Sequence, residues 1–150
     1  MNETRITSMD VARAAGVSQS AVSRVFTPGA SVSKATVAKV KEAARALGYR
    51  PNSLARAMIT GKSRIIGLVV AYLDNPFYPV ALERLSHALQ QRGYHILIFM
   101  ASNTQESIKS VVEDLMAYQV DGIIAASVSL SGELAASCAA AGVPVVLFNR

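Results

Sequence analysis

The chain has 150 residues, and its 51% hydrophobic and 17% charged residues support a packed core and exclude wholesale disorder. This length allows one or two compact domains, and the single cysteine, Cys138, excludes an internal disulfide, fits a reducing compartment and is interpreted as a small buried apolar residue. No segment approaches the ~20 uninterrupted apolar residues of a membrane span, and the polar start lacks an apolar run of signal-peptide length, so we expect a cytoplasmic protein.

The net charge of +5 is unevenly distributed along the chain. Residues 1–64 carry eleven Lys or Arg and three acidic residues, a net charge of +8, whereas residues 65–150 carry four bases and seven acids, a net charge of −3. A basic segment joined to a mildly acidic body is typical of nucleic-acid binding confined to one part of a protein. A solvated basic surface without a partner would give the same charge, so only the motifs can distinguish it from a nucleic-acid-binding surface.

A short helix is predicted at Met9–Ala15. Thr7 or Ser8 can accept hydrogen bonds from its first amides, and Asp10 lies near its positive dipole end. Gly16 then allows the chain to turn, because glycine adopts the left-handed conformation at little cost.

A second helix is predicted at Gln19–Phe26, with Ser18 as its cap. Five apolar residues have the spacing to pack these two helices together and are interpreted as core: Ala12, Ala15, Val17, Val22 and Val25. Four polar residues would face outward: Gln19, Ser20, Ser23 and Arg24. On the first half of a helix such side chains can enter the major groove of DNA, where arginine reads guanine and glutamine reads adenine. Without the surrounding motif, Arg24 would be interpreted as an ordinary solvated surface arginine.

A third helix is predicted at Lys34–Leu47, with Ser33 as its cap, and an apolar stripe on it closes a small helical core. Pro51 disfavours helix at the residue before it, and Asn52–Met58 then fits one or two further helical turns. A helix this short is marginal in isolation, so a flexible linker is the alternative for that segment.

After about residue 61, apolar runs alternate with amphipathic stretches. Four runs predict strands: Ile65–Val70, His95–Met100, Gly122–Ala126 and Val143–Phe148. The stretches between them predict helices: Phe77–Arg92, Gln105–Tyr118 and Gly132–Ala141. Continuously apolar strands are typical of parallel sheets covered on both faces, and the alternation predicts right-handed crossovers in a doubly wound α/β sheet.

The segments MDVARAAGVSQSAVSRVF and VSKATVAKVKEAARALGYRPN resemble the LacI/GalR family of bacterial transcription regulators, and the resemblance runs from about Ile6 to the last residue. It implies a multidomain fold: an all-α, lambda repressor-like helix-turn-helix head, then a partial, periplasmic binding protein-like parallel sheet. The implied boundaries are 1–50 for the DNA-binding domain, 51–63 for a hinge helix and linker, and 64–150 for an incomplete N-terminal lobe of an effector-binding and dimerisation domain.

The resemblance also implies roles for residues of the head. Gln19 and Ser20 match the variable base-reading positions, and Arg24 matches a largely fixed groove contact. Six hydroxyl residues are placed near the phosphates of the DNA backbone: Thr7, Ser8, Ser18, Ser23, Thr27 and Ser33. Thr27 departs from the asparagine that the family often has, and a serine that caps a helix is structural in itself.

The hinge helix of the family orders when two subunits pair over the operator and enters the minor groove. Met58 occupies the position of a leucine that wedges between the central base steps. The resemblance places Ala55 against the groove floor and Arg56 near the DNA backbone, with Asn52 at the start of the helix.

Effector binding is expected at the carboxyl ends of the strands, where open α/β sheets bind their ligands. Phe77 and Tyr78 match family positions that place aromatic rings against a sugar or base, Ser127 follows the third strand, and Arg150 matches a polar position that bonds an effector. Each role has an equally weighted structural alternative. Pro76 and Phe77 could instead form a helix start with a buried aromatic ring, and Arg150 could be a frayed terminus. The leucines of Phe77–Arg92 match a family dimer surface, although covering the sheet is the commoner role.

Family members continue for roughly another domain, so we expect this chain to be a truncated part of a longer protein, with an incomplete effector cleft and an exposed sheet edge. The resemblance implies a dimeric, repressor-type regulator that binds a palindromic double-stranded operator and, in full-length form, a sugar or related metabolite. It also implies a bacterial cytoplasmic location on the nucleoid.

Three other functions are open to a chain of this kind. An enzyme is disfavoured because the sequence has no GxGxxG, GxxxxGK[ST] or GxSxG motif and no metal-ligand spacing, and His87 and His95 have no evident partner, so no catalysis, cofactor or metal is expected. A small-molecule carrier is disfavoured by the missing signal peptide and the basic head. A fragment that folds its head but lacks dimer contacts is the third.

Overall fold

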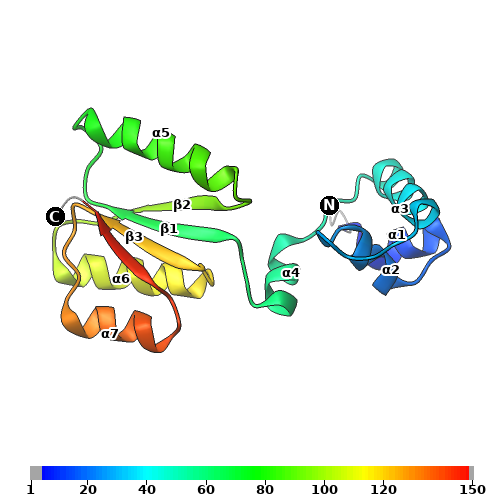
Figure 1. The fold of residues 1–150 in the computed structure, drawn as a ribbon. Helices are drawn as coiled ribbons and strands as arrows, with labels where there is room; N and C mark the ends of the chain where they lie inside the picture. The colour runs from blue at the N-terminus through cyan, green and yellow to red at the C-terminus, as the bar shows by residue number, and fades with distance from the viewer. Residues whose placement is uncertain (1–4, 149–150) are drawn as a thin grey trace. The chain divides into compact units, whose positions relative to one another are not determined.

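The computed structural model describes residues 5–148, which form two compact units divided between Asn52 and Ser53. The first unit consists of three helices, α1 (Ser8–Ala15), α2 (Gln19–Val25) and α3 (Lys34–Leu47) (Figure 1). These bounds confirm the predicted helices to within one residue at each end. Gly16 and Gly48, which follow α1 and α3, both adopt the left-handed conformation that closes a helix.

Three valines are fully buried at the centre of this helical unit, namely Val11, Val22 and Val40, one from each helix. Val17 and Val25, expected in the core, are half-buried and pack against its edge. Val11 was not expected in the core, because a single apolar stripe does not predict that α1 turns two neighbouring residues, Val11 and Ala12, toward the other helices. The apolar face of α1 is therefore wider than a single stripe.

A reciprocal cap begins α1. The amide of Asp10 donates to the Thr7 hydroxyl over 3.3 Å, while the Thr7 amide and hydroxyl donate to the Asp10 carboxylate over 2.9 Å and 2.7 Å. The backbone hydrogen bond from Thr7 first, then its hydroxyl, hold the pKa of the Asp10 carboxyl below its ordinary value against a small opposing effect of burial, and Arg13 adds a weaker attraction.

Acidification should open this cap. Because the folded pKa of Asp10 is depressed, its stabilising contribution is present above the ordinary aspartate pKa and is lost as the pH falls through the folded pKa. We expect the Thr7 amide signal in NMR spectra to titrate with a midpoint below that ordinary value, and Asp10→Asn to abolish the titration. A midpoint at or above the ordinary value would contradict the capping account.

The second unit begins with a helix and then alternates strands with helices. Its elements are α4 (Ser53–Thr60), β1 (Ile65–Val70), α5 (Phe77–Gln90), β2 (His95–Met100), α6 (Gln105–Ala117), β3 (Gly122–Ala126), α7 (Gly132–Ala140) and β4 (Val145–Phe148). The predicted strands and helices are confirmed to within two residues. The last strand starts at Val145 rather than Val143, because the Val143 amide closes α7 on Cys138 and Pro144 has no amide to donate.

The four strands are all parallel and lie in the order β2-β1-β3-β4, as a doubly wound sheet requires. Helix α5 lies on one face of the sheet, and α6 and α7 lie on the other (Figure 1). β4 is an edge strand whose residues Val146, Leu147 and Phe148 are exposed, so the apolar edge expected from the sequence is present among the described residues.

Alternate side chains of the central strands point into two cores, one on each face of the sheet. Val69, Ile123 and Ala125 pack against α6 and α7, whereas Leu68, Val70 and Ala126 pack beneath α5. Leu115 of α6 packs directly on Gly67 of β1, where an added Cβ would lie 2.8 Å from one of its methyl groups. Among the described residues, no helix has both the length and the apolar character needed to cross a membrane.

Cys138 lies on the buried face of α7 and is fully enclosed by the core, as the sequence predicts. Burial raises the pKa of its thiol, so little of the reactive thiolate forms near neutral pH. We expect a thiol-specific reagent to modify Cys138 only slowly in the native chain and rapidly after denaturation. Equally fast modification in both states would mean that this core opens readily.

Candidate DNA interface and effector site

The outward face of α2 presents Gln19, Ser20, Ser23 and Arg24, and all four are exposed. The amide nitrogen of the Gln19 side chain donates to the Ser8 hydroxyl over 2.9 Å. This hydrogen bond ties the start of α2 to the start of α1, so two groups of predicted DNA-contacting residues lie side by side.

Arg24 lies one helical turn beyond Ser20, on the same side of α2. Among the described residues, no hydrogen bond or ion pair engages its guanidinium group. Arg13 and Arg45, by contrast, lie 3.7 Å and 2.7 Å from the carboxylates of Asp10 and Glu42. Arg24 therefore keeps all its donors available, and a guanidinium fork can bond both acceptors on the major-groove edge of a guanine.

The helix-start hydroxyls serve the fold as well. Ser18 and Ser33 accept hydrogen bonds of 3.2 Å from the amides of Ala21 and Thr36, as predicted for caps. Each is exposed, and its hydroxyl also lies near a second one, 3.2 Å from that of Ser20 for Ser18 and 2.8 Å from that of Thr36 for Ser33. When the neighbouring hydroxyl is the donor in that pair, the serine can donate its own proton to an acceptor such as a phosphate oxygen. Thr27 is different, because its hydroxyl donates to the Ser23 carbonyl over 2.8 Å and the residue is half-buried.

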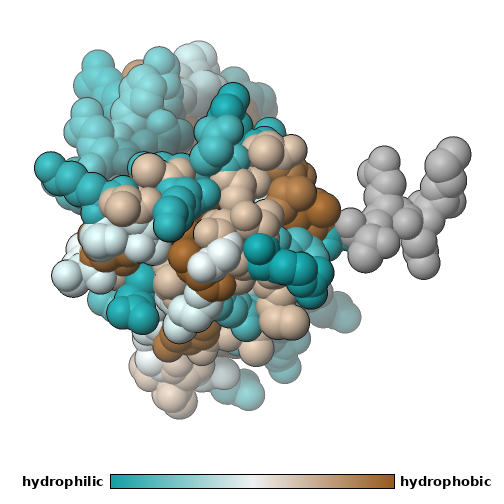
Figure 2. All heavy atoms as spheres, turned by 90° about the vertical axis from the view of Figure 1, so that its right-hand side faces the viewer, coloured by the Kyte–Doolittle hydropathy of each residue, from teal (hydrophilic) through white to brown (hydrophobic). Residues whose placement is uncertain are grey.

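The surface of this unit is mixed in character. In the foreground of Figure 2, apolar side chains form small separate patches among hydrophilic ones, and no broad apolar area gathers on this face. Such a surface suits a hydrated, charged partner better than a large apolar one.

Helix α4 has the opposite character, because its outward residues are mainly apolar. Met58 is 80% exposed and Ile59 is 81% exposed, with Leu54 and Ala55 exposed one turn earlier. Asn52 precedes the helix and is exposed, whereas Arg56 is half-buried. Met58 was expected to be exposed here, whereas Leu54 and Ile59 were not singled out, although their apolar side chains at helical spacing were a usable signal.

At the carboxyl ends of β1 and β3, three hydroxyl groups meet. Tyr78 is only 3% exposed and its hydroxyl bonds that of Ser127, which in turn donates to the Tyr72 hydroxyl over 3.4 Å. Ser127 has a left-handed backbone, with φ +54°, directly after β3. Tyr72, which is 45% exposed, was not singled out from the sequence.

Phe77 is half exposed and stacks on Phe148 with ring centroids 5.8 Å apart, whereas the neighbouring Tyr78 ring is buried. The two aromatic residues singled out together therefore have different surroundings, and Phe77 is the one that a ligand can reach. Arg150, the remaining residue predicted for this site, lies outside the described residues.

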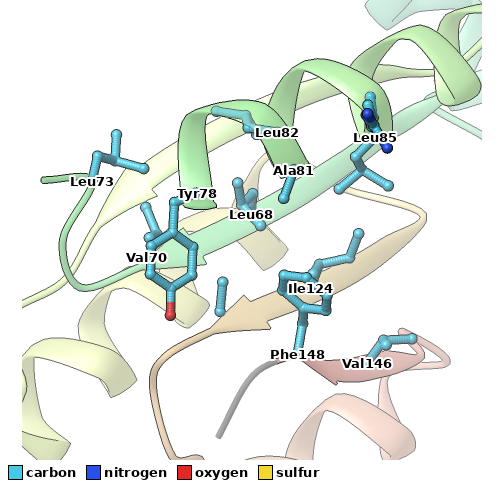
Figure 3. Close-up of a pocket in the computed structure, with 12 residues that line it drawn as sticks. Leu68, Val70, Leu73, Tyr78, Ala81, Leu82, Leu85, Ile124, Val146 and Phe148 are labelled. Carbon is cyan, nitrogen blue, oxygen red and sulfur yellow. The ribbon is translucent and has the colours of Figure 1, made fainter. Parts of the chain in front are cut away.

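A groove of about 410 Å³ opens between α5 and the uncovered part of β3 and β4 (Figure 3). Leu82 and Leu85 of α5 face Ile124, Val146 and Phe148 of the strands across it. Its lining is almost entirely apolar and offers few partners for sugar hydroxyl groups, so the hydroxyl cluster around Ser127 is the better candidate for a polar ligand. Within residues 5–148, no group of three His, Cys, Asp or Glu side chains could hold a metal ion.

Comparison with known proteins gives two family matches. Residues 7–52 match the family described as bacterial regulatory proteins, lacI family. Residues 63–150 match periplasmic binding proteins and sugar binding domain of LacI family.

Individual relatives are similar over nearly the whole chain. The sucrose operon repressor of Streptococcus mutans is 36% identical over 94% of this chain and 43% of its own length. Catabolite control protein A of Staphylococcus epidermidis is 33% identical over 95% of this chain and 43% of its own length. The chain thus spans less than half the length of these relatives.

Two solved structures are also similar. The lac repressor dimer bound to operator and the anti-inducer ONPF has a TM-score of 0.80 at 30% identity, covering 96% of this chain and 44% of that one. A LacI-family transcriptional regulator from Silicibacter pomeroyi has a TM-score of 0.79 at 31% identity, covering 95% of this chain and 43% of that one.

Proposed function

Because the chain belongs to the LacI family of bacterial regulatory proteins, we propose that it binds a palindromic DNA operator as a homodimer and regulates transcription as a repressor. The observation that carries this proposal is the exposed polar face of α2, with the unengaged guanidinium of Arg24, in the basic part of the chain. In full-length form the protein responds to a small-molecule effector. A cytoplasmic place of action, on the nucleoid, follows from its target.

Each segment has its own task in this proposal. Residues 1–50 are the helix-turn-helix domain, residues 51–63 are the hinge and linker, and residues 64–150 are part of the effector-binding and dimerisation domain. This assignment is supported by the similarity of nearly the whole chain to a repressor dimer that was solved on its operator.

The first half of α2 enters the major groove. Arg24 bonds a guanine edge, while Gln19 and Ser20 read neighbouring base edges and set which operator is preferred. Hydroxyl groups at the helix starts, on Ser18 and Ser33, donate to phosphate oxygens and fix the register of the head on the duplex, while the hydroxyl proton of Thr7 stays with Asp10.

Helix α4 enters the minor groove at the centre of the operator. The exposed Met58 side chain wedges between base steps there, and Ala55 allows close approach to the groove floor. A methionine wedge is apolar but flexible, so it adapts to more than one central base step.

The effector binds at the carboxyl ends of β1 and β3. Tyr72 and Ser127 offer hydroxyl groups for the polar atoms of the ligand, and Phe77 offers an aromatic ring to pack on its apolar face. A sugar or related metabolite suits this combination, and the sugar-binding family match over residues 63–150 supports that class of ligand.

The DNA interface is tested by titrating the ¹⁵N-labelled chain with duplex DNA and following its amide signals. We expect the largest shifts at residues 18–26 and at the starts of α1 and α3, with small shifts in β1 to β4. Shifts concentrated in the strands, or none at saturating DNA, would refute the proposed interface.

A matched pair of glutamine variants tests base reading. The side-chain amide of Gln19, on α2, donates to the Ser8 hydroxyl over 2.9 Å, and the side-chain amide of Gln90, on α5, donates to the Ser86 hydroxyl over 3.3 Å. Gln19→Ala should change the operator sequences recovered by selection, whereas Gln90→Ala, which removes the same type of hydrogen bond, should not. Identical recovered sequences from both variants would exclude Gln19 from base reading.

A further inference from the structure

The connector between α4 and β1 is held by hydrogen bonds along its length. The Gly61 amide closes α4 on the Ala57 carbonyl over 2.8 Å, with Gly61 in the left-handed conformation. The Thr60 hydroxyl donates to the Arg56 carbonyl over 3.0 Å and accepts from the Lys62 amide over 3.3 Å. The end of the hinge helix therefore continues directly into an ordered connector, residues 61–64, which leads to β1.

A single carboxylate fixes the next two residues. One oxygen of Asp121 accepts from the amide and hydroxyl of Ser63 over 2.8 Å and 3.2 Å, and its other oxygen accepts from the Arg64 amide over 3.1 Å. Asp121 is half-buried and immediately precedes β3, and its own amide donates to Ile65 over 2.8 Å. Hydrogen bonds to an ionised acceptor are stronger than neutral ones, so this carboxylate is a firm anchor.

Arg64 has an unfavourable backbone conformation, which its surroundings must stabilise. Its φ of +59° lies in the left-handed region, which a residue with a side chain adopts only when its surroundings hold it there. Its carbonyl accepts from the His95 amide over 2.9 Å, and its guanidinium lies 5.2 Å from the centre of the Tyr94 ring. Contacts from both neighbouring strands thus set the direction in which the chain leaves α4.

We propose that Asp121 is a positioning residue for DNA binding, which acts by clamping Ser63 and Arg64 and so fixes the direction in which the chain runs from the hinge helix α4 into β1. This inference rests on the proposed function. Asp121 touches no DNA itself; it reduces the number of orientations that α4 can sample before it enters the groove.

The test is a double-mutant cycle on DNA affinity in the 150-residue chain. Asp121→Asn keeps the size of the side chain but places an N–H₂ donor against a backbone amide. Met58→Ala removes the exposed apolar group of α4. Affinity is measured by fluorescence anisotropy on the duplex that the unchanged chain selects from a random-sequence library, and Asp114→Asn, an exposed carboxamide change on α6, is the matched control.

We expect Asp121→Asn to lower affinity about tenfold, as residues in one network commonly do, and Met58→Ala to cost little more once Asp121 is changed. Amide hydrogen exchange at Ser63 and Arg64 should accelerate, while Asp114→Asn should leave both quantities unchanged. Unchanged affinity in Asp121→Asn, or losses that simply add with Met58→Ala, would overturn the inference, because a purely structural role lowers stability without that coupling. If the unchanged chain prefers no duplex, the proposed function fails first and this inference with it.

Discussion

Arg24→Ala should weaken binding to the preferred duplex by about 1–3 kcal/mol, or roughly 5- to 150-fold, which is the usual cost of losing one good bidentate base contact. The reason is local, because Arg24 is exposed on α2 and no group in the described part of the chain occupies its guanidinium. The loss should be sequence-dependent: affinity for an unrelated duplex should fall much less. Fluorescence anisotropy on both duplexes at one fixed salt concentration measures the difference.

Arg45→Ala is the control for charge. Arg45 lies on α3, and its guanidinium bonds both oxygens of Glu42, at 2.7 Å and 3.0 Å. Both variants remove one positive charge from the same unit, so they change the long-range attraction to phosphates about equally. Equal losses in the two variants would remove Arg24 from base recognition and leave it as one basic residue among many.

Changes at Leu115 and Gly67 should have the largest effects on stability. Leu115 is fully buried on α6, so Leu115→Ala should cost the second unit about 2–5 kcal/mol of its free energy of unfolding. A Cβ at position 67 would lie 2.8 Å and 2.9 Å from the two terminal methyl groups of Leu115. Gly67→Ala should therefore cost about 1–3 kcal/mol through overpacking.

The two changes should compensate each other when combined. In the double variant the new methyl group at position 67 enters space that Leu115→Ala has vacated, so its cost should vanish or change sign. Denaturant titration followed through amide signals of β1 and β3 gives the free energies. Gly132→Ala is the control, because nothing lies within 4 Å of the Cβ it would add. Strict additivity of the first two changes would contradict the close contact between β1 and α6.

Local sequence patterns predicted most of the fold. Apolar spacing on α3 and the cap at Ser33 fixed that helix to the residue, and continuous apolar runs located the parallel strands. Tyr78 was harder, because Phe77 and Tyr78 are neighbours and each step along a helix turns the side chain by about 100°. Which of two adjacent aromatic residues enters the core depends on how α5 docks on the sheet.

The long-range contacts of both sites were beyond local patterns. Tyr72 and Ser127 meet because β1 and β3 are parallel neighbours in the sheet. For the same reason Asp121 reaches Ser63 at the amino ends of these two strands. The order of the strands decides both contacts, and no spacing within the sequence encodes it directly. The surface residues of α2 could be named from the sequence, since an amphipathic helix exposes whatever its apolar face does not use.

Selection from a random-sequence duplex library, performed with this chain at two salt concentrations, tests the central claim most directly. A dimeric operator-binding regulator should enrich a palindromic site, and its affinity for that site should fall as salt rises because bound phosphates release counterions. Salt-sensitive binding without any enriched sequence would contradict the claim, because the basic head would then attract DNA without reading it.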